Sequence, residues 1–196
     1  MLPKPNEIRN AAIGCWSLVL GRGEGLARFD LTMDGFWRSF QWAFVLAILD
    51  AVDGYAGRGI AGDGIEAHAS ALAIVVGSGL ASFLTFVTFP LIFMLLARIM
   101  RLGSAYAPYI IVRNWMTVFL SVPVYLLDML SAFDLLPDEL RNAWVLILFI
   151  VTLSAGTLIA RQILKVGLTL AFGFAFLDFL LALLIGEAAA RLLGGG

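Results

Sequence analysis

The sequence predicts an all-α, polytopic membrane protein with five transmembrane helices and an amphipathic amino-terminal helix at the membrane interface. Of its 196 residues, 61% are hydrophobic and only 14% are charged, against roughly 25% charged in soluble proteins. Residues 69–97 form an uninterrupted run without an ionisable side chain. At about 1.5 Å per residue, a helix of that length exceeds a hydrocarbon core of roughly 30 Å. Buried helices of soluble proteins rarely exceed about 20 residues and normally carry a polar stripe, so a membrane span explains this run better.

Composition also narrows the chemistry that the chain supports. A formal net charge of −1 argues against a nucleic-acid partner. The single cysteine, Cys15, cannot form an internal disulfide, and the single histidine, His68, cannot build a metal site alone. The sequence shows no pattern of nucleophile, base or metal ligands, so we expect no catalytic residues, no metal and no cofactor. The first ten residues lack the apolar centre of a signal peptide, and we expect the first span to direct insertion.

Residues 1–35 are predicted to form a cytoplasmic and interfacial segment. Between residues 7 and 20, apolar side chains recur at helical spacing, which indicates a short helix lying on the membrane surface. The predicted apolar face consists of Ile8, Ala12, Cys15, Trp16 and Val19. Gly21, Gly23 and Gly25 are expected to end this helix. The GRGEG stretch lacks the preceding strand and the Lys-Ser/Thr ending of a phosphate-binding loop, so a helix stop is the preferred interpretation.

Residues 36–196 are predicted to form one transmembrane domain. Its five spans are expected at about residues 36–52, 69–100, 105–127, 143–160 and 166–186. Pro90 is the expected bend in the second span, and the glycine-rich residues 54–68 are expected to form an exposed loop. Merging the last two spans would bury Arg161 and Lys165 at about +2.5 to +3.5 kcal/mol each, so five spans are preferred over four.

The distribution of basic residues predicts the orientation. With five spans, one side of the membrane receives Lys4, Arg9, Arg22, Arg28, Arg38, Arg98, Arg101, Arg161 and Lys165. The other side receives only Arg58, Arg141 and Arg191. Cytoplasmic loops carry the excess of lysine and arginine, so the amino terminus is predicted to be cytoplasmic and the carboxyl terminus periplasmic. Acidic residues of the outer side, such as Asp50 and Asp128, lack calcium-loop spacing, and ordinary solvated loops are preferred over a cation funnel or a calcium site.

Two charges, Arg113 and Asp178, fall within the predicted spans, and ionisable residues at membrane depth are the default candidates for function. They lie about 12 Å and 18 Å from the cytoplasmic ends of their predicted helices. Near Arg113 on the third span lies a polar stripe of Tyr106, Tyr109, Asn114, Thr117 and Ser121. We expect Arg113 and Asp178 to pair, because an unpaired carboxylate at this depth favours protonation. Two alternatives stay open: Arg113 extends to cytoplasmic headgroups beside a neutral Asp178, or Asp178 relays protons or cations.

Small and aromatic residues predict packing sites and membrane anchors. Small residues permit close approach of helices, and they gather in the second and fifth spans. They are Gly77, Ala81, Gly167, Ala171 and Ala175. Four tryptophans near predicted span ends are interpreted as interface anchors, namely Trp37, Trp42, Trp115 and Trp144.

The overall layout resembles that of the Yip1-type membrane proteins. Shared features are a cytoplasmic amino-terminal segment, five closely spaced spans over about residues 36–185, and a short outer tail. The stretch YAPYIIVRNWMTVFLSVP, residues 106–123, is similar to polar-aromatic segments of bacterial Yip1-like five-span proteins. In eukaryotic members the resemblance implies vesicle-trafficking partners, including small GTPases. The bacterial members imply only an integral membrane protein, and the minimal loops of this chain favour the bacterial case. The resemblance implies no catalytic residues.

These observations predict a non-enzymatic scaffold or accessory protein of the bacterial cytoplasmic membrane, which organises a membrane complex or its lipid environment. The expected partners are the lipid bilayer and either another membrane protein or further copies of the same chain. The alternative is a small transporter or channel that uses the buried charges of Arg113 and Asp178. Against this alternative, only Pro90 and Pro123 interrupt the predicted spans, whereas transporters typically show paired broken helices or repeats.

Overall fold

The computed structural model describes residues 5–58, 70–133, 135 and 137–194. This part of the chain is all-α, as predicted, and contains no β-strand. Its elements are α1 (Pro5–Val19), the 3-10 helix η1 (Gly23–Arg28), α2 (Met33–Arg58), α3 (Ala71–Ile99), α4 (Gly103–Ala132), α5 (Asp138–Leu164) and α6 (Leu168–Gly194). The loop predicted at residues 54–68 lies partly outside the described residues, as does His68. The first five residues of that predicted loop, 54–58, belong to α2 instead.

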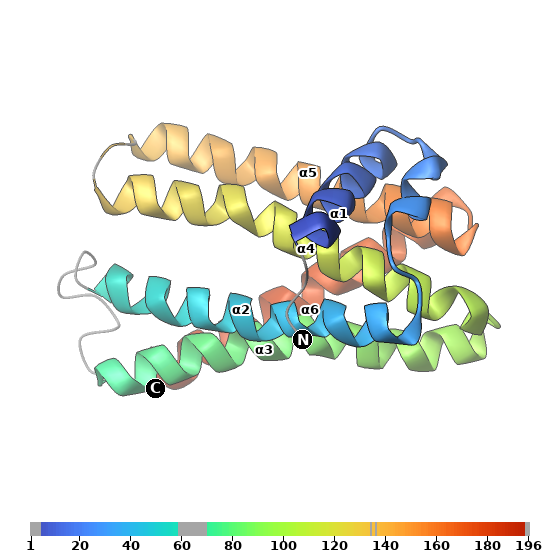
Figure 1. Ribbon diagram of the computed structural model, residues 1–196. Helices are drawn as coiled ribbons and strands as arrows, with labels where there is room; N and C mark the ends of the chain where they lie inside the picture. The colour runs from blue at the N-terminus through green and yellow to red at the C-terminus, as the bar shows by residue number, and fades with distance from the viewer. Residues whose placement is uncertain (1–4, 59–69, 134, 136, 195–196) are drawn as a thin grey trace.

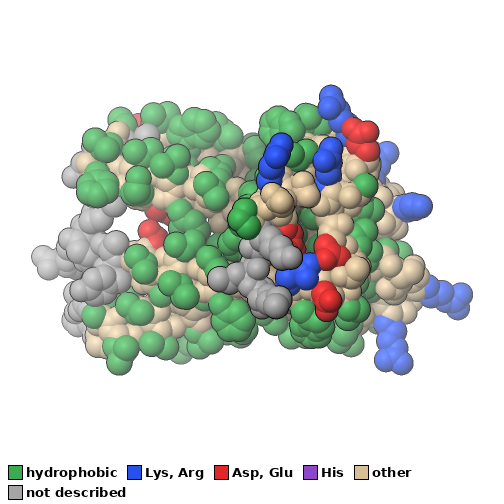
Figure 2. Space-filling view, in the orientation of Figure 1, with side chains coloured by type: hydrophobic (Ala, Val, Ile, Leu, Met, Phe, Trp, Pro, Cys, Tyr) green, Lys and Arg blue, Asp and Glu red, His purple; other side chains and the backbone are tan. Residues whose placement is uncertain are grey.

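Helices α2 to α6 run alternately between the same two ends of the molecule (Figure 1). Helix α2 lies along α3, α4 contacts α2, α3 and α5, and α6 lies against α5 and α3. Lysine and arginine side chains gather at the end that holds η1 and the α3–α4 turn, which we call the basic end (Figure 2). At the opposite end the α4–α5 pair diverges from α2 and α3, and the surface is hollowed between them (Figures 1 and 2).

Four helices in the described part of the chain are long and apolar enough to cross a membrane. They are α3, α4, α5 and α6, and together they are typical of a multi-pass membrane protein. Helix α2 is long enough but more polar. Arg38 and Gln41 lie near its start and Asp50 and Asp53 near its end, so its longest run without a charge is residues 39–49.

The helix boundaries differ from the predicted spans. Helices α2, α4 and α5 extend at both ends beyond those spans, because hydropathy marks only the charge-free centre whereas backbone hydrogen bonding continues into polar residues. Helix α6 begins later than predicted, at Leu168, because α5 continues to Leu164 and Lys165 then adopts a left-handed conformation with a φ of 53°. Helix α3 runs through Pro90 as one continuous helix.

Helix α1 packs on α4 and α5 with a face that matches the predicted one only in part: Cys15 is buried, and Ile8 and Val19 pack against the core. Its buried residues are Ala11, Gly14, Cys15 and Leu18, whereas Trp16 of the predicted face is 66% exposed. Small side chains let the α1 backbone approach the bundle closely, and a tryptophan would prevent that approach. Burial raises the pKa of the Cys15 thiol to about 12, so this cysteine is not a reactive nucleophile at neutral pH.

Glycines and polar contacts fasten the amino-terminal segment to the bundle. A Cβ at Gly25 of η1 would lie 2.6 Å from the carbonyl oxygen of Gly14 in α1, so a larger residue would separate the two elements. From α2, Arg38 Nε donates to Glu7 Oε1 at 3.2 Å, and its Nη2 pairs with Asp30. The amino-terminal segment is therefore held at the basic end by contacts with its own bundle.

Trp115 is a core residue and not an interface anchor, so that prediction was wrong. It is 2% exposed and packs edge to face on Trp42, with the ring centroids 5.4 Å apart. The cause is the central position of α4, which has neighbours on several sides. By contrast, Trp37 and Trp144 are 64% and 43% exposed.

Candidate functional site

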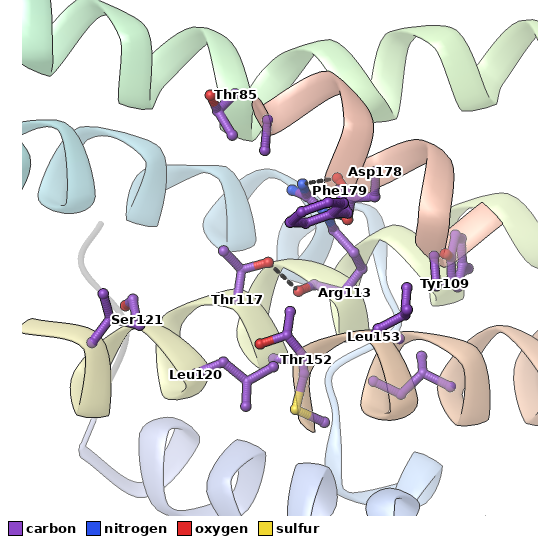
Figure 3. Close-up of a pocket in the computed structure, with 16 residues that line it drawn as sticks. Thr85, Tyr109, Arg113, Thr117, Leu120, Ser121, Thr152, Leu153, Asp178 and Phe179 are labelled. Atoms are coloured by element: carbon purple, nitrogen blue, oxygen red, sulfur yellow. Dashed lines mark hydrogen bonds and ion pairs between the residues drawn. The ribbon is translucent and has the colours of Figure 1, made fainter. Parts of the chain in front are cut away.

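Arg113 of α4 and Asp178 of α6 form the ion pair predicted from the sequence (Figure 3). Nε of Arg113 donates to Asp178 Oδ2 at 2.9 Å, and Nη2 donates to Oδ1 at 2.6 Å. Two parallel hydrogen bonds of this kind form one of the strongest contacts between arginine and a carboxylate. The side chains of Arg113 and Asp178 are 8% and 25% exposed. The structure therefore contains the predicted pair and not the arrangement in which Arg113 extends to headgroups.

The positions of the helix starts explain why these side chains meet. Arg113 lies ten residues after Gly103, the first residue of α4, and Asp178 lies ten residues after Leu168, the first residue of α6. At about 1.5 Å per residue, both are roughly 15 Å along their helices from the basic end. The unequal depths expected from the sequence, about 12 Å and 18 Å, arose from misplaced helix starts.

A proline in α3 provides the third partner of Arg113. In an α-helix the N–H of one residue bonds the carbonyl four residues earlier, and Pro90 has no N–H. The carbonyl of Phe86 therefore lacks its helical donor, and Nη1 of Arg113 donates to it at 3.0 Å. A carbonyl without a donor is costly in an apolar environment, as is a guanidinium N–H without an acceptor. The hydrogen bond between Arg113 and the Phe86 carbonyl removes both costs. This role of Pro90 was missed in the sequence, although an intrahelical proline is the signal that points to such a carbonyl.

Two phenylalanines of α3 cover the guanidinium. The Arg113 Cζ atom lies 5.3 Å from the ring centroid of Phe86 and 5.4 Å from that of Phe89. Both distances are within the range of a cation–π contact, which is strongest where water is excluded. Phe86 and Phe89 are 2% and 0% exposed, so they shield the charge from solvent and lipid.

Asn114 extends the network to α2. Its Oδ1 accepts from Arg113 Nη1 at 3.3 Å, and its Nδ2 donates to Ser39 Oγ at 3.0 Å. The Ser39 hydroxyl in turn donates to the Phe36 carbonyl at 2.7 Å. Asn114 and Ser39 are both 0% exposed. The network thus joins side chains or carbonyls of α2, α3, α4 and α6, and Ser39 was not predicted to take part.

The ion pair also lines a cavity of about 260 Å³, here called the chamber, between α3, α4, α5 and α6 (Figure 3). Its polar lining comprises the pair, Tyr109 and the hydroxyl side chains of Thr85, Thr117, Ser121 and Thr152. Its apolar lining includes Met116, Leu120, Leu153, Ile159 and Phe179. Thr117 donates to the Arg113 carbonyl at 3.0 Å and Ser121 to the Val118 carbonyl at 2.8 Å. These two hydroxyls therefore donate their hydrogen bonds to backbone carbonyls of α4.

The predicted polar stripe of α4 is divided between three surroundings. Tyr109, Thr117 and Ser121 line the chamber beside Arg113. Asn114 is turned towards α2, as described above. Tyr106 donates its hydroxyl to the Pro90 carbonyl at 3.1 Å and lines a second cavity.

This second cavity, here called the groove, lies between α2, α3 and the start of α4 and has a volume of about 610 Å³. Its lining is mostly aromatic and aliphatic, and it includes Phe36, Trp37, Phe40, Phe44, Phe83 and Val87. No charged residue is among its lining residues.

Within the described residues, no group of three histidine, cysteine or acidic side chains is placed to hold a metal ion.

The small residues predicted to pack helices have mixed outcomes. A Cβ at Gly77 would lie 2.7 Å from Leu193 Cδ2, so α6 approaches α3 closely there. Ala171 and Ala175 are buried and Ala81 is half-buried. Gly167 is exposed with no atom within 4 Å of a Cβ, so its predicted packing role was wrong, because it lies in the turn before α6. Gly156 was missed: a Cβ there would lie 3.1 Å from Ala175 Cβ.

A double-mutant cycle tests whether the pair acts as a unit. Each of Arg113→Gln and Asp178→Asn should lower the free energy of unfolding by about 3–5 kcal/mol, because each leaves one buried charge without its partner. The double mutant should lose far less than the sum of the two, since both charges are then removed. The measurement is equilibrium unfolding of the purified protein in detergent micelles. Losses that add would contradict the pairing.

Helix α6, which contains Asp178, also provides a matched control for this cycle. Glu187 and Arg191 of α6 also pair, at 2.8 Å, but their side chains are 57% and 79% exposed. Surface pairs of this type contribute about 0–1 kcal/mol, so Glu187→Gln and Arg191→Gln should change unfolding little.

Comparisons with protein-family models, with curated proteins and with solved structures find no match to this chain. Its function is therefore inferred from the geometry and chemistry of its own residues.

Proposed function

We propose that this chain is a five-span integral protein of the bacterial cytoplasmic membrane, with its amino terminus cytoplasmic and its carboxyl terminus periplasmic. The alternating course of α2 to α6 between the two ends of the molecule supports five crossings (Figure 1). An odd number of crossings places the two termini on opposite sides of the membrane. The gathering of basic side chains at one end supports the orientation, because cytoplasmic loops carry most lysine and arginine (Figure 2). The resemblance to Yip1-type proteins stays a prediction.

The polar residues of α2 are compatible with a fifth span. Arg38 lies at the basic end, where Glu7 and Asp30 neutralise its charge. Asp50 and Asp53 lie in the last third of the helix, towards the opposite end. The uncharged residues 39–49 between them cover about 16 Å at 1.5 Å per residue, and side chains near helix ends extend to the headgroups.

Within the membrane, the proposed role is that of a non-enzymatic scaffold or accessory protein. The observation that carries this proposal is the network around Arg113, in which the buried charge binds partners on other helices and holds the bundle together. The first half of α5 supports it, because most of its residues are exposed, among them Val145, Leu146 and Ile150. This apolar surface suits lipid, a partner membrane protein or a second copy of the chain.

The second candidate is a small transporter or channel. It is favoured by the 25% exposure of the Asp178 side chain, which lines the chamber although it is paired. Buried acids that remain accessible are typical of proton and ion pathways.

Accessibility of introduced cysteines tests the five-span topology. In a Cys15→Ser background, Arg22→Cys marks the basic end and Arg191→Cys marks the opposite end; both native residues are exposed. In intact cells, a membrane-impermeant maleimide should label Arg191→Cys at once. It should label Arg22→Cys only after the membrane is permeabilised. Equal labelling of both positions in intact cells would place the termini on one side and exclude five spans.

Purification and flux measurements distinguish the scaffold from the transporter. The scaffold proposal predicts that mild-detergent purification and native mass spectrometry find a stoichiometric protein subunit or a homo-oligomer. It also predicts that vesicles containing the protein show no proton or cation flux above empty vesicles. Proton or cation flux that is abolished in Asp178→Asn and unchanged in Glu187→Gln would contradict the scaffold proposal and support the transporter.

A further inference from the structure

The chamber combines a mostly apolar lining with a carboxylate that is paired but still accessible. Most of its lining is aliphatic or aromatic, and the ion pair provides its only charges. Of the two paired side chains, Asp178 is the more accessible, at 25% exposed against 8% for Arg113. A molecule that enters the chamber therefore meets the carboxylate more readily than the guanidinium.

Asp178 retains capacity to accept further hydrogen bonds. Each of its oxygens accepts one hydrogen bond from Arg113. An ionised carboxylate offers about four acceptor sites, so roughly two remain. A hydroxyl donor on a carboxylate forms a short, charge-assisted hydrogen bond. Asp178 is thus able to bind a donor without giving up Arg113.

The charge balance of the chamber selects a neutral ligand. Arg113 and Asp178 cancel each other, so a cationic or anionic headgroup would add a net charge in a region of low dielectric. Transfer of an unpaired charge from water into such a region is far more costly than transfer of a hydroxyl that forms a hydrogen bond. A hydroxyl donates to a free acceptor site of Asp178 and adds no net charge to the chamber.

The size and position of the chamber indicate a molecule from the bilayer. A cavity of roughly 150 Å³ holds benzene, and the chamber is larger, at about 260 Å³. It lies among four helices that are long and apolar enough to span a membrane. We propose that the chamber binds a neutral lipid with a free hydroxyl group, whose O–H donates to the Asp178 carboxylate and whose hydrocarbon chain lies along Leu120, Leu153 and Phe179. This inference rests on the membrane placement proposed above, but not on the scaffold role.

The groove serves as an internal control. It is also apolar and is larger, at about 610 Å³, but its lining contains no charged residue. Any lipid chain should enter the groove regardless of its headgroup. Selection by headgroup is expected only in the chamber, because only the chamber contains Asp178.

Photolabelling with three matched probes tests the proposal. The probes are diazirine-bearing hexadecanol, its methyl ether and the corresponding hexadecylammonium, each at the same mole fraction in phosphatidylcholine vesicles that contain the full chain. Labelled peptides of α5 and α6 report the chamber, because α3 and α4 line both cavities, and labelled peptides of α2 report the groove. The alcohol should label the chamber about fivefold more than the ether, the factor for a hydrogen bond of about 1 kcal/mol. It should also exceed the ammonium, and all three should label the groove equally.

Two alanine substitutions locate the labelling. Ala182 lines the chamber and Ala107 lines the groove, and both are half-buried. Ala182→Phe should lower alcohol labelling of the chamber peptides at least fivefold, because a ring in the binding volume excludes the hydrocarbon chain as well as the hydroxyl, whose hydrogen bond alone accounts for about 1 kcal/mol. Ala107→Phe should reduce labelling of the groove and leave the chamber unchanged.

The outcomes separate the ligand proposal from the membrane placement. Equal labelling of the chamber by all three probes, or stronger labelling by the ammonium, would overturn the neutral hydroxyl ligand. Labelling of the groove alone would overturn the chamber as a binding site while supporting the membrane placement. Absence of labelling at both sites would overturn the placement and the ligand together.

Discussion

The buried guanidinium of Arg113 is the constraint on which the bundle depends. A charge at the centre of a membrane helix costs about 2.5 to 3.5 kcal/mol, and a guanidinium also brings five N–H donors that need acceptors. These acceptors come from Asp178 in α6, the Phe86 carbonyl in α3 and Asn114 within α4 itself. Asn114 also binds Ser39 of α2, so Arg113 and Asn114 together constrain the relative positions of four helices.

This arrangement is consistent with the different character of the two ends of the molecule. Towards the basic end, α1 and η1 cover the bundle, and Arg38 of α2 pairs with Glu7 of α1 and with Asp30, which follows η1. Beyond the ion pair the α4–α5 pair diverges from α2 and α3, and the first half of α5 is largely exposed (Figure 1). The chamber lies against the ion pair. The same carboxylate therefore stabilises the bundle and lines the space between its helices.

Much of the fold and the central pair were predictable from the sequence, because charge is so rare in an apolar span that Arg113 and Asp178 stand out. Details that depend on three-dimensional packing were not predictable. The apolar face of α1 was partly misjudged because its neighbours are other helices, which select small residues such as Ala11 and exclude Trp16. Hydropathy likewise cannot show that Trp115 lies in the core or that Gly167 lies in an open turn. The link from Pro90 through Phe86 to Arg113 needed α3 and α4 to be placed side by side.

The central claim is that Asp178 is ionised and paired with Arg113 within the bilayer. Infrared difference spectroscopy tests it most directly, using protein with ¹³C-labelled aspartate in lipid vesicles and subtracting the spectrum of Asp178→Asn. At neutral pH the account predicts that the bands lost in the variant are the stretching bands of a carboxylate. Loss of the carbonyl band of a protonated carboxylic acid instead would contradict the ion pair, and with it the explanation of how the bundle is held together.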